Sequence, residues 1–170
     1  MSGWTLREAT EADLPALLEL HQDYHRELQA FGMPYDLKPD GLEGALRLRV
    51  RSRLILTAVA QGEDGSLAGF VVCSILRLAN EYLCQGCGSV GYLNDLYVIP
   101  ALRRQGLALE LTGMAEDWLR EREIPTMQLQ VLQNNPAAHR YWQRAGMGPV
   151  GTLYDKKLVK SEENCHGTCG

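Results

Sequence analysis

The segment 103–108 has the composition of a loop that binds phosphate groups. Arg103 and Arg104 provide positive charge, Gly106 allows the backbone to approach a ligand closely, and Ala108 leaves the next turn open. Apolar residues with helical spacing follow, so the loop leads into a helix whose first N–H groups and dipole favour an anion. The segment therefore predicts a pyrophosphate site, with a plain helix start carrying two solvated arginines as the alternative. The chain has no Gly-x-x-x-x-Gly-Lys-Ser/Thr pattern, which argues against an ATP-dependent activity.

His21 and His25 are spaced so that two imidazoles would share one helical face. They lie four residues apart, but no third metal ligand can be named, so a packing or acceptor-pocket role is favoured. A later predicted helix has arginine at every second position, which spreads these side chains around it and predicts a solvated face. These arginines are Arg47, Arg49, Arg51 and Arg53.

Two groups of cysteine residues contain enough ligands for a zinc ion. They are Cys84-x-x-Cys87 and Cys165-His166-x-x-Cys169. The first lies in a glycine-rich loop and the second in a weakly structured tail, so free thiols are favoured and no metal is expected. An interaction domain stabilised by a bound zinc ion is the weaker alternative.

The helices and strands that position these residues are predicted from the spacing of apolar residues and from the glycine and proline residues that interrupt it. Helices are predicted at 13–28, where Thr10 and Asp13 form a capping box, and at 41–51, 107–121 and 136–145. Strands are predicted at 4–7, 54–60, 67–78, 92–99, 127–132 and 153–159. This order indicates an α/β (α+β) fold with a mixed sheet. One domain over residues 1–160 and a flexible tail over 161–170 are expected.

Composition limits the possible functions. The chain of 170 residues carries 21 acidic and 17 basic side chains, a formal net charge of −4, which disfavours binding to nucleic acid. No window approaches the ~18 apolar residues of a membrane helix, and no leader is evident, so a cytoplasmic protein without membrane association is expected. The five cysteines, an odd number, favour reduced thiols.

Two motifs resemble those of the GNAT superfamily of acetyl-CoA-dependent N-acetyltransferases. Arg103-x-x-Gly106-x-Ala108 is similar to the family signature Gln/Arg-x-x-Gly-x-Gly/Ala. A second motif is carried by Asn134, Ala137, Tyr141, Gly146 and Met147, with methionine where the family usually has phenylalanine. The resemblance covers residues 3–159 and implies a mixed, mostly antiparallel sheet of about six to seven strands with about four flanking helices.

The resemblance also implies where acetyl-CoA, the cosubstrate, binds. Backbone N–H groups of residues 104–109 would hold the pyrophosphate, and the edge of the strand before the loop would pair with the pantetheine amides. The residues implied in cofactor binding are Leu96, Tyr97, Val98, Arg103, Arg104, Gln105, Gly106, Leu107, Ala108, Leu109, Asn134 and Tyr141.

Two side chains are implied in proton transfer. Asp95 occupies the strand position where many family members have a carboxylate base, although it could instead brace the strand. Tyr141 matches the family's proton donor to the departing sulfur. A backbone N–H near Leu96 is the expected partner of the oxygen in the tetrahedral intermediate.

The resemblance predicts transfer of an acetyl group from acetyl-CoA to a primary amine by direct attack in a ternary complex, with a small molecule favoured as the acceptor. The alternatives are a protein or peptide N-acetyltransferase, and a degenerate module that binds acyl-CoA without turnover. The acceptor pocket is implied at residues 21–41 and 79–91, which include Tyr24, Phe31, Tyr35, Glu81 and Tyr82. The resemblance also suggests a homodimer, because many relatives pair as dimers.

Overall fold

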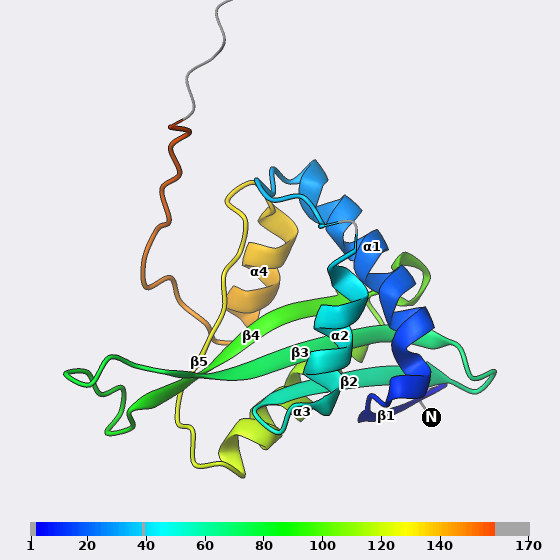
Figure 1. Ribbon diagram of the computed structural model, residues 1–170, viewed down its shortest axis with the longest axis horizontal. Helices are drawn as coiled ribbons and strands as arrows, with labels where there is room; N and C mark the ends of the chain where they lie inside the picture. Colours follow the sequence, from blue (N-terminus) through cyan, green and yellow to red (C-terminus); the bar gives the residue numbers. More distant parts are fainter. Residues whose placement is uncertain (1–2, 39, 159–170) are drawn as a thin grey trace, which may run out of the picture. The chain divides into compact units, whose positions relative to one another are not determined.

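The described strands of the computed structural model form one sheet in the order β1-β2-β3-β4-β5 (Figure 1). They are β1 (Trp4–Glu8), β2 (Ile55–Gly62), β3 (Leu67–Arg77), β4 (Ser89–Val98) and β5 (Met127–Gln128). The first three pairings are antiparallel, and β4 pairs with β5 in parallel. The mixed, mostly antiparallel sheet predicted from the sequence is confirmed.

The structure describes residues 3–38 and 40–158, and the chain divides into two units, Met1–Pro136 and Ala137–Gly170. The first unit contains the sheet and the helices α1 (Leu14–Ala30), α2 (Leu42–Arg51) and α3 (Leu107–Arg120). The second contains α4 (Pro136–Arg144) except its first residue. The tail expected at 161–170 lies outside the described residues, together with the Cys165 and Cys169 pair.

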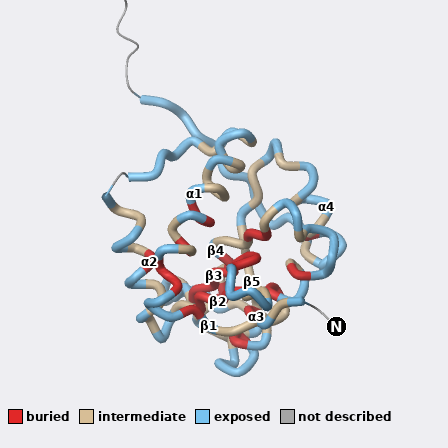
Figure 2. Tube along the Cα trace, turned by 90° about the vertical axis from the view of Figure 1, so that its right-hand side faces the viewer, coloured by how far each residue is buried: buried red, intermediate tan, exposed pale blue. Residues whose placement is uncertain are grey.

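Helices cover both faces of the sheet in the first unit. Figure 2 shows α1 and α2 on one side of the strands and α3 on the other. Leu17 of α1 and Leu46 of α2 are fully buried in one apolar cluster with Phe70 and Val72 of β3. On the opposite face, α3 packs so closely that a Cβ on Gly91 would lie 2.3 Å from a methyl group of Leu119. β3 is therefore buried on both sides from Leu67 to Ser74.

The predicted capping box at the start of α1 is present and holds β1 to the helix. The N–H of Thr10 donates to Oδ2 of Asp13 at 2.7 Å, and the Arg7 guanidinium donates to both carboxylate oxygens at 2.8 and 2.7 Å. These hydrogen bonds, Arg7 first, lower the pKa of Asp13 from 3.8 to about 2. A short turn of 3-10 helix, Glu11–Asp13, leads from this cap into α1.

Asp13→Asn should destabilise the protein by about 2 kcal/mol at neutral pH, because the depressed pKa measures how strongly the fold favours the carboxylate. That stability is present above about pH 4 and is lost as the pH falls towards about pH 2. Urea unfolding at several pH values measures it, and the variant should lose this part of the pH dependence. Glu43→Gln, which breaks the exposed pair with Arg47, should cost less than about 0.5 kcal/mol. Equal effects of the two substitutions would contradict the role of Asp13.

The strand count is lower than expected. The described sheet has five strands, where six to seven were predicted, and β5 is confined to Met127–Gln128. Residues 153–158 form no strand, and their apolar side chains are exposed, with Tyr154 90% accessible. Without apolar burial, nothing offsets the entropy of ordering this segment as a strand. The apolar residues of this segment were therefore a misleading signal for a strand.

Candidate active site

The loop between β4 and α3 (residues 103–109, the phosphate loop) has the backbone geometry of an anion site. Gly106 precedes the helix at φ +90°, and Arg104 also has a positive φ of 64°. Within the described residues, the backbone N–H groups of 104–108 donate to no other backbone group, whereas that of Leu109 donates to the Gly106 carbonyl at 2.9 Å. A Cβ on Gly106 would meet no atom within 4 Å. Free N–H groups at a helix start fit a phosphate group.

The two arginines of the phosphate loop differ in their environment. Arg103 donates to both carboxylate oxygens of Glu27 at 2.7 and 2.9 Å, and to the Val98 carbonyl at 2.8 Å. Its guanidinium also lies 5.5 Å from the centre of the Tyr97 ring. Arg103 therefore ties the loop to α1 and β4, while the exposed Arg104 remains a cation at the loop surface.

One edge of β4 is open beside this loop. The parallel pairing with β5 consists of Gly91 with Met127 and Tyr92 with Gln128. The chain then leaves β4, so residues 93–98 have no strand partner on that side within the described part of the chain (Figure 1). This open edge includes Leu96, Tyr97 and Val98. An extended ligand with amide groups could pair there as an added strand would.

A β-bulge in β4 sets the direction of Asp95. Val72 lies opposite Asp95 and Cys73 opposite Leu93, so Asn94 is the additional residue. The Asn94 side chain accepts a hydrogen bond from the Ser74 hydroxyl at 2.8 Å. After the bulge, Asp95 points to the face covered by α1 and α2, where its side chain is 19% accessible.

Arg49 of α2 holds the Asp95 carboxylate. Its Nη1 donates to Oδ2 of Asp95 at 3.0 Å. The sequence-based prediction of a solvated arginine face is wrong for this residue, because Leu42, Leu46 and Arg49 form one stripe at helical spacing and Leu46 is fully buried. That spacing was the signal that could have identified Arg49. Arg47 and Arg51 do form exposed pairs, with Glu43 and Glu11.

His21 of α1 also faces Asp95. Its Nδ1 donates to the Leu17 carbonyl at 2.9 Å, and its ring stacks on Phe70 with centroids 4.0 Å apart. The buried Nε2 has no hydrogen-bond partner among the described residues and lies 4.0 Å from Oδ2 of Asp95. Burial lowers the pKa of His21, against the opposing effect of the Asp95 charge, and keeps the ring neutral. Two acceptors thus face each other, an arrangement that favours a proton donor between them.

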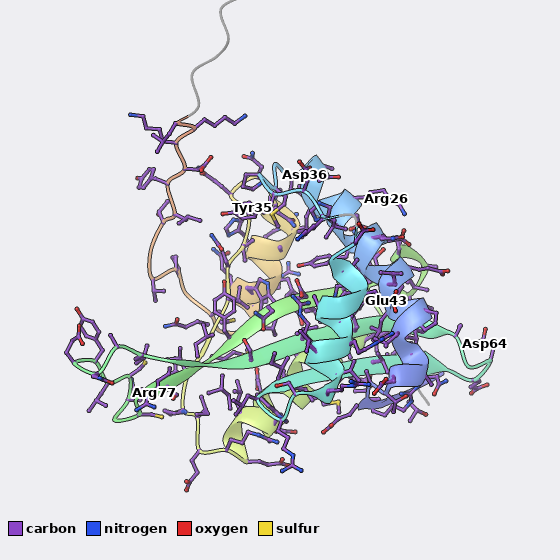
Figure 3. The ribbon with its side chains drawn as sticks, viewed as in Figure 1. Arg26, Tyr35, Asp36, Glu43, Asp64 and Arg77 are labelled. Atoms are coloured by element: carbon purple, nitrogen blue, oxygen red, sulfur yellow. The ribbon has the colours of Figure 1, made fainter. Side chains whose placement is uncertain are left out.

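Tyr24 of α1 packs against aromatic rings of the apolar cluster near this carboxylate. Tyr24 contacts Phe70 and Tyr97 with ring centroids 6.0 and 5.7 Å apart, and burial raises the pKa of Tyr24. Tyr24 therefore packs as a neutral phenol. The loop between α1 and α2 carries the exposed Tyr35, next to Asp36, which accepts a hydrogen bond from Gln29 at 3.1 Å (Figure 3).

The other predicted site residues lie after β5. Asn134 is exposed, and its amide nitrogen lies 3.6 Å from the position of a Cβ on Gly32, after α1. Tyr141 belongs to the second unit, in α4, where it packs edge-on against Trp142 at 4.8 Å. Gly146 stands beyond the end of α4 at φ +85°, as predicted. The structure thus brings Asp95, the open edge of β4 and the phosphate loop into one continuous segment of the first unit.

Residues 14–147 match the sequence profile of the family described as acetyltransferase (GNAT). The chain belongs to the GNAT acetyltransferase family. Aminoglycoside N(6')-acetyltransferase type 1 of Klebsiella aerogenes is 42% identical over 72 residues, which are 42% of this chain and 44% of that enzyme. This match spans less than half the length of the Klebsiella enzyme. The uncharacterized N-acetyltransferase YhfO of Bacillus subtilis (strain 168) is 24% identical over 83% of this chain and 87% of its own length.

Solved GNAT structures share the fold. The aminoglycoside 6'-N-acetyltransferase AAC(6')-Ih of Acinetobacter baumannii has a TM-score of 0.73 at 19% identity, covering 93% of this chain and all (100%) of that one. A predicted acetyltransferase of Clostridium acetobutylicum, crystallised with acetyl-CoA, has a TM-score of 0.75 at 17% identity, over 94% and 99% of the two chains. These structures show that the chain has the same fold.

The described part of the GNAT chain contains no candidate membrane-spanning helix and no candidate metal-binding cluster. None of its described helices is long and apolar enough to cross a membrane. Among residues 3–38 and 40–158, no group of three or more His, Cys, Asp or Glu side chains could hold a metal ion.

Proposed function

We propose that this GNAT acetyltransferase moves the acetyl group of acetyl-CoA to a primary amine of a small, positively charged molecule of the aminoglycoside type. The observation that carries the proposal is the position of Asp95, a half-buried carboxylate at the bulge where the open edge of β4 begins. The local 42% identity to an aminoglycoside acetyltransferase supports the class of acceptor.

The chain would hold acetyl-CoA along β4 and the phosphate loop. When bound, acetyl-CoA supplies a thioester carbonyl that an amine can attack. The free N–H groups of residues 104–108 and the exposed Arg104 would bind the pyrophosphate, while Arg103 keeps the loop fixed through Glu27. The open edge at Leu96, Tyr97 and Val98 would pair with the pantetheine amides, and a backbone N–H near Leu96 would stabilise the developing oxyanion.

Asp95 would remove the proton from the acceptor amine. An alkyl amine with a pKa of ~10.4 is protonated at neutral pH and must lose a proton to attack. Among the described residues, Arg49 donates to Oδ2 of Asp95 at 3.0 Å, and His21 Nε2 also lies on the Oδ2 side, at 4.0 Å. Oδ1 therefore remains for the ammonium, directly or through a water molecule. The negative charge at this position also favours a cationic acceptor.

Tyr141→Phe should lower turnover by about 10²-fold or less, with little change in affinity for CoA. Tyr141 would protonate the departing sulfur. The effect of losing this proton donor should be small, because a thiol with a pKa of ~8.5 already leaves readily as the thiolate. Steady-state rates and calorimetric titration with CoA measure the two quantities. Trp142→Phe changes the neighbouring ring of α4 and serves as the packing control. An equal loss of turnover and affinity would show that the tyrosine acts only through structure.

A panel of acceptors tests the proposed substrate class. The protein is incubated with acetyl-CoA and, separately, an aminoglycoside, a linear diamine, and a peptide with a free amino terminus and a lysine, and the products are identified by mass spectrometry. The proposal predicts a single acetyl group on a small-molecule amine, with the aminoglycoside preferred. Preferred acetylation of the peptide would identify a protein acetyltransferase, and CoA binding without any product would identify a sensor. The homodimer and the cytoplasmic location stay predictions.

A further inference from the structure

Cys84 and Cys87 stand opposite each other across a two-residue turn in the loop between β3 and β4. The Cys84 N–H donates to the Cys87 carbonyl at 2.8 Å, and the Cys87 N–H donates to the Cys84 carbonyl at 2.9 Å. The two residues between them, Gln85 and Gly86, have positive φ values of 50° and 78°. This is the backbone pattern of a type I′ hairpin turn, in which the two flanking side chains lie on the same side.

The two thiols are free and differ from the third described cysteine in accessibility. Cys84 and Cys87 are half-buried, and Gln85 and Gly86 between them are exposed, so a small molecule can reach the sulfurs. Cys73 is buried in β3, and burial raises its pKa to about 12. An unreactive internal reference is thus present in the same chain.

We propose that Cys84 and Cys87 form a reversible disulfide by exchange with a low-molecular-weight disulfide such as oxidised glutathione. One cysteine thiolate attacks a sulfur of the glutathione disulfide, which forms a mixed disulfide and releases one glutathione thiolate. The second cysteine thiolate attacks the protein sulfur of that mixed disulfide and releases the other glutathione. The two cysteine sulfurs are oxidised, the glutathione disulfide is reduced to two thiols, and the two protons lost by the protein thiols go to the glutathione thiolates.

The turn geometry favours a labile bond over a permanent one. Directly opposite residues with paired hydrogen bonds have Cα atoms about 5.5 Å apart, inside the range that a disulfide spans. Their Cβ atoms lie about 4.5–5.5 Å apart, whereas a relaxed disulfide has them about 3.8 Å apart. Closing the bond therefore strains the turn, and strained disulfides are easily reduced.

The modification also affects the segment before β5. In the thiol form, Cys84 donates a hydrogen bond through Sγ to Oγ1 of Thr126 at 3.4 Å. A disulfide sulfur has no hydrogen to donate, so oxidation removes this contact. Thr126 stands directly before β5, the strand that pairs with β4 where the open edge begins.

Tryptic mapping of the full chain in glutathione buffers tests the proposal. Cleavage after Arg and Lys separates the cysteines into the peptides 54–77, 78–103 and 161–170, with Cys84 and Cys87 together in the second. As the ratio of oxidised to reduced glutathione rises, peptide 78–103 should lose two hydrogens and resist alkylation, and excess reduced glutathione should restore it. Cys73 in peptide 54–77 should stay reduced. Recovery of 78–103 in the thiol form throughout, carrying glutathione, or linked to 161–170 would overturn the proposal.

Glycine variants test whether the turn causes the reactivity. Gly86 has a positive φ and Gly88 does not, and a Cβ on either would meet no atom within 4 Å. Gly86→Val should require an oxidised-to-reduced ratio about tenfold higher, because a β-branched residue opposes the left-handed conformation. Gly88→Val should respond as the parent does, and so should Gly86→Asn, because asparagine tolerates that conformation. The same response in Gly86→Val and Gly88→Val would show that the turn plays no part.

Discussion

Asp95→Asn is expected to lower kcat for acetyl transfer by about 10²- to 10⁴-fold, the range associated with loss of a general base. Asparagine has nearly the same shape and can still accept the hydrogen bond from Arg49, but it cannot take a proton from an ammonium group. The affinity for CoA and the melting temperature should change little, since Asp95 is itself partly accessible. Rates of CoA release with a saturating amine measure the effect.

Asp117→Asn is a matched control for this substitution. Asp117 lies on α3 in an exposed pair with Arg120, on the opposite side of the sheet from Asp95. Its kcat should match that of the parent protein. If Asp95→Asn raised KM and left kcat unchanged, Asp95 would bind the acceptor without acting as a base, and another group would have to take the proton.

Gly106→Val is expected to weaken CoA binding by about 100-fold or more. Gly106 has a φ of +90°, where a β-branched residue is strained, so the substitution should distort the loop that carries the free N–H groups. Loss of even one charge-assisted hydrogen bond adds about 1.5–3 kcal/mol to the cost of that strain. Calorimetric titration with CoA measures the change.

Gly113→Val, in the helix that follows Gly106, is the control for Gly106→Val. Gly113 lies inside α3, has ordinary backbone angles, and would also meet no atom within 4 Å with an added Cβ. Its affinity for CoA should stay within about twofold of the parent value, because the substitution changes only helix propensity, by less than about 1 kcal/mol. Similar losses of affinity in both variants would mean that the Gly106 loop does not hold the pyrophosphate.

Local sequence signals predicted most of the first unit. Thr10 with Asp13 marked the start of α1, the predicted strands 54–60 and 67–78 correspond to β2 and β3, and the apolar stripe from Leu107 to Leu119 marked α3. Each signal depends on residues close together in the chain. The motif at Arg103, Gly106 and Ala108 likewise depends on local spacing, and it led to the correct family.

The surroundings of Asp95 could not be predicted in the same way. The bulge at Asn94, which turns Asp95 towards the helices, arises from pairing with β3, a strand about 20 residues earlier in the sequence. Arg49 and His21 reach Asp95 from two helices, and His21 was interpreted from the sequence as a packing or acceptor-pocket residue. The pairing of the Arg103 guanidinium with Glu27, 76 positions away, was likewise not predicted. Contacts between distant segments leave no local pattern.

The central claim is that the amine attacks acetyl-CoA directly while both are bound beside Asp95. Initial rates of CoA release, measured over a grid of acetyl-CoA and amine concentrations, test it together with the intact mass of the enzyme after exposure to acetyl-CoA alone. Direct transfer should give CoA release that depends on the amine, intersecting double-reciprocal lines, and an enzyme of unchanged mass. Parallel lines with an acetylated enzyme, or release that does not depend on any amine, would contradict it.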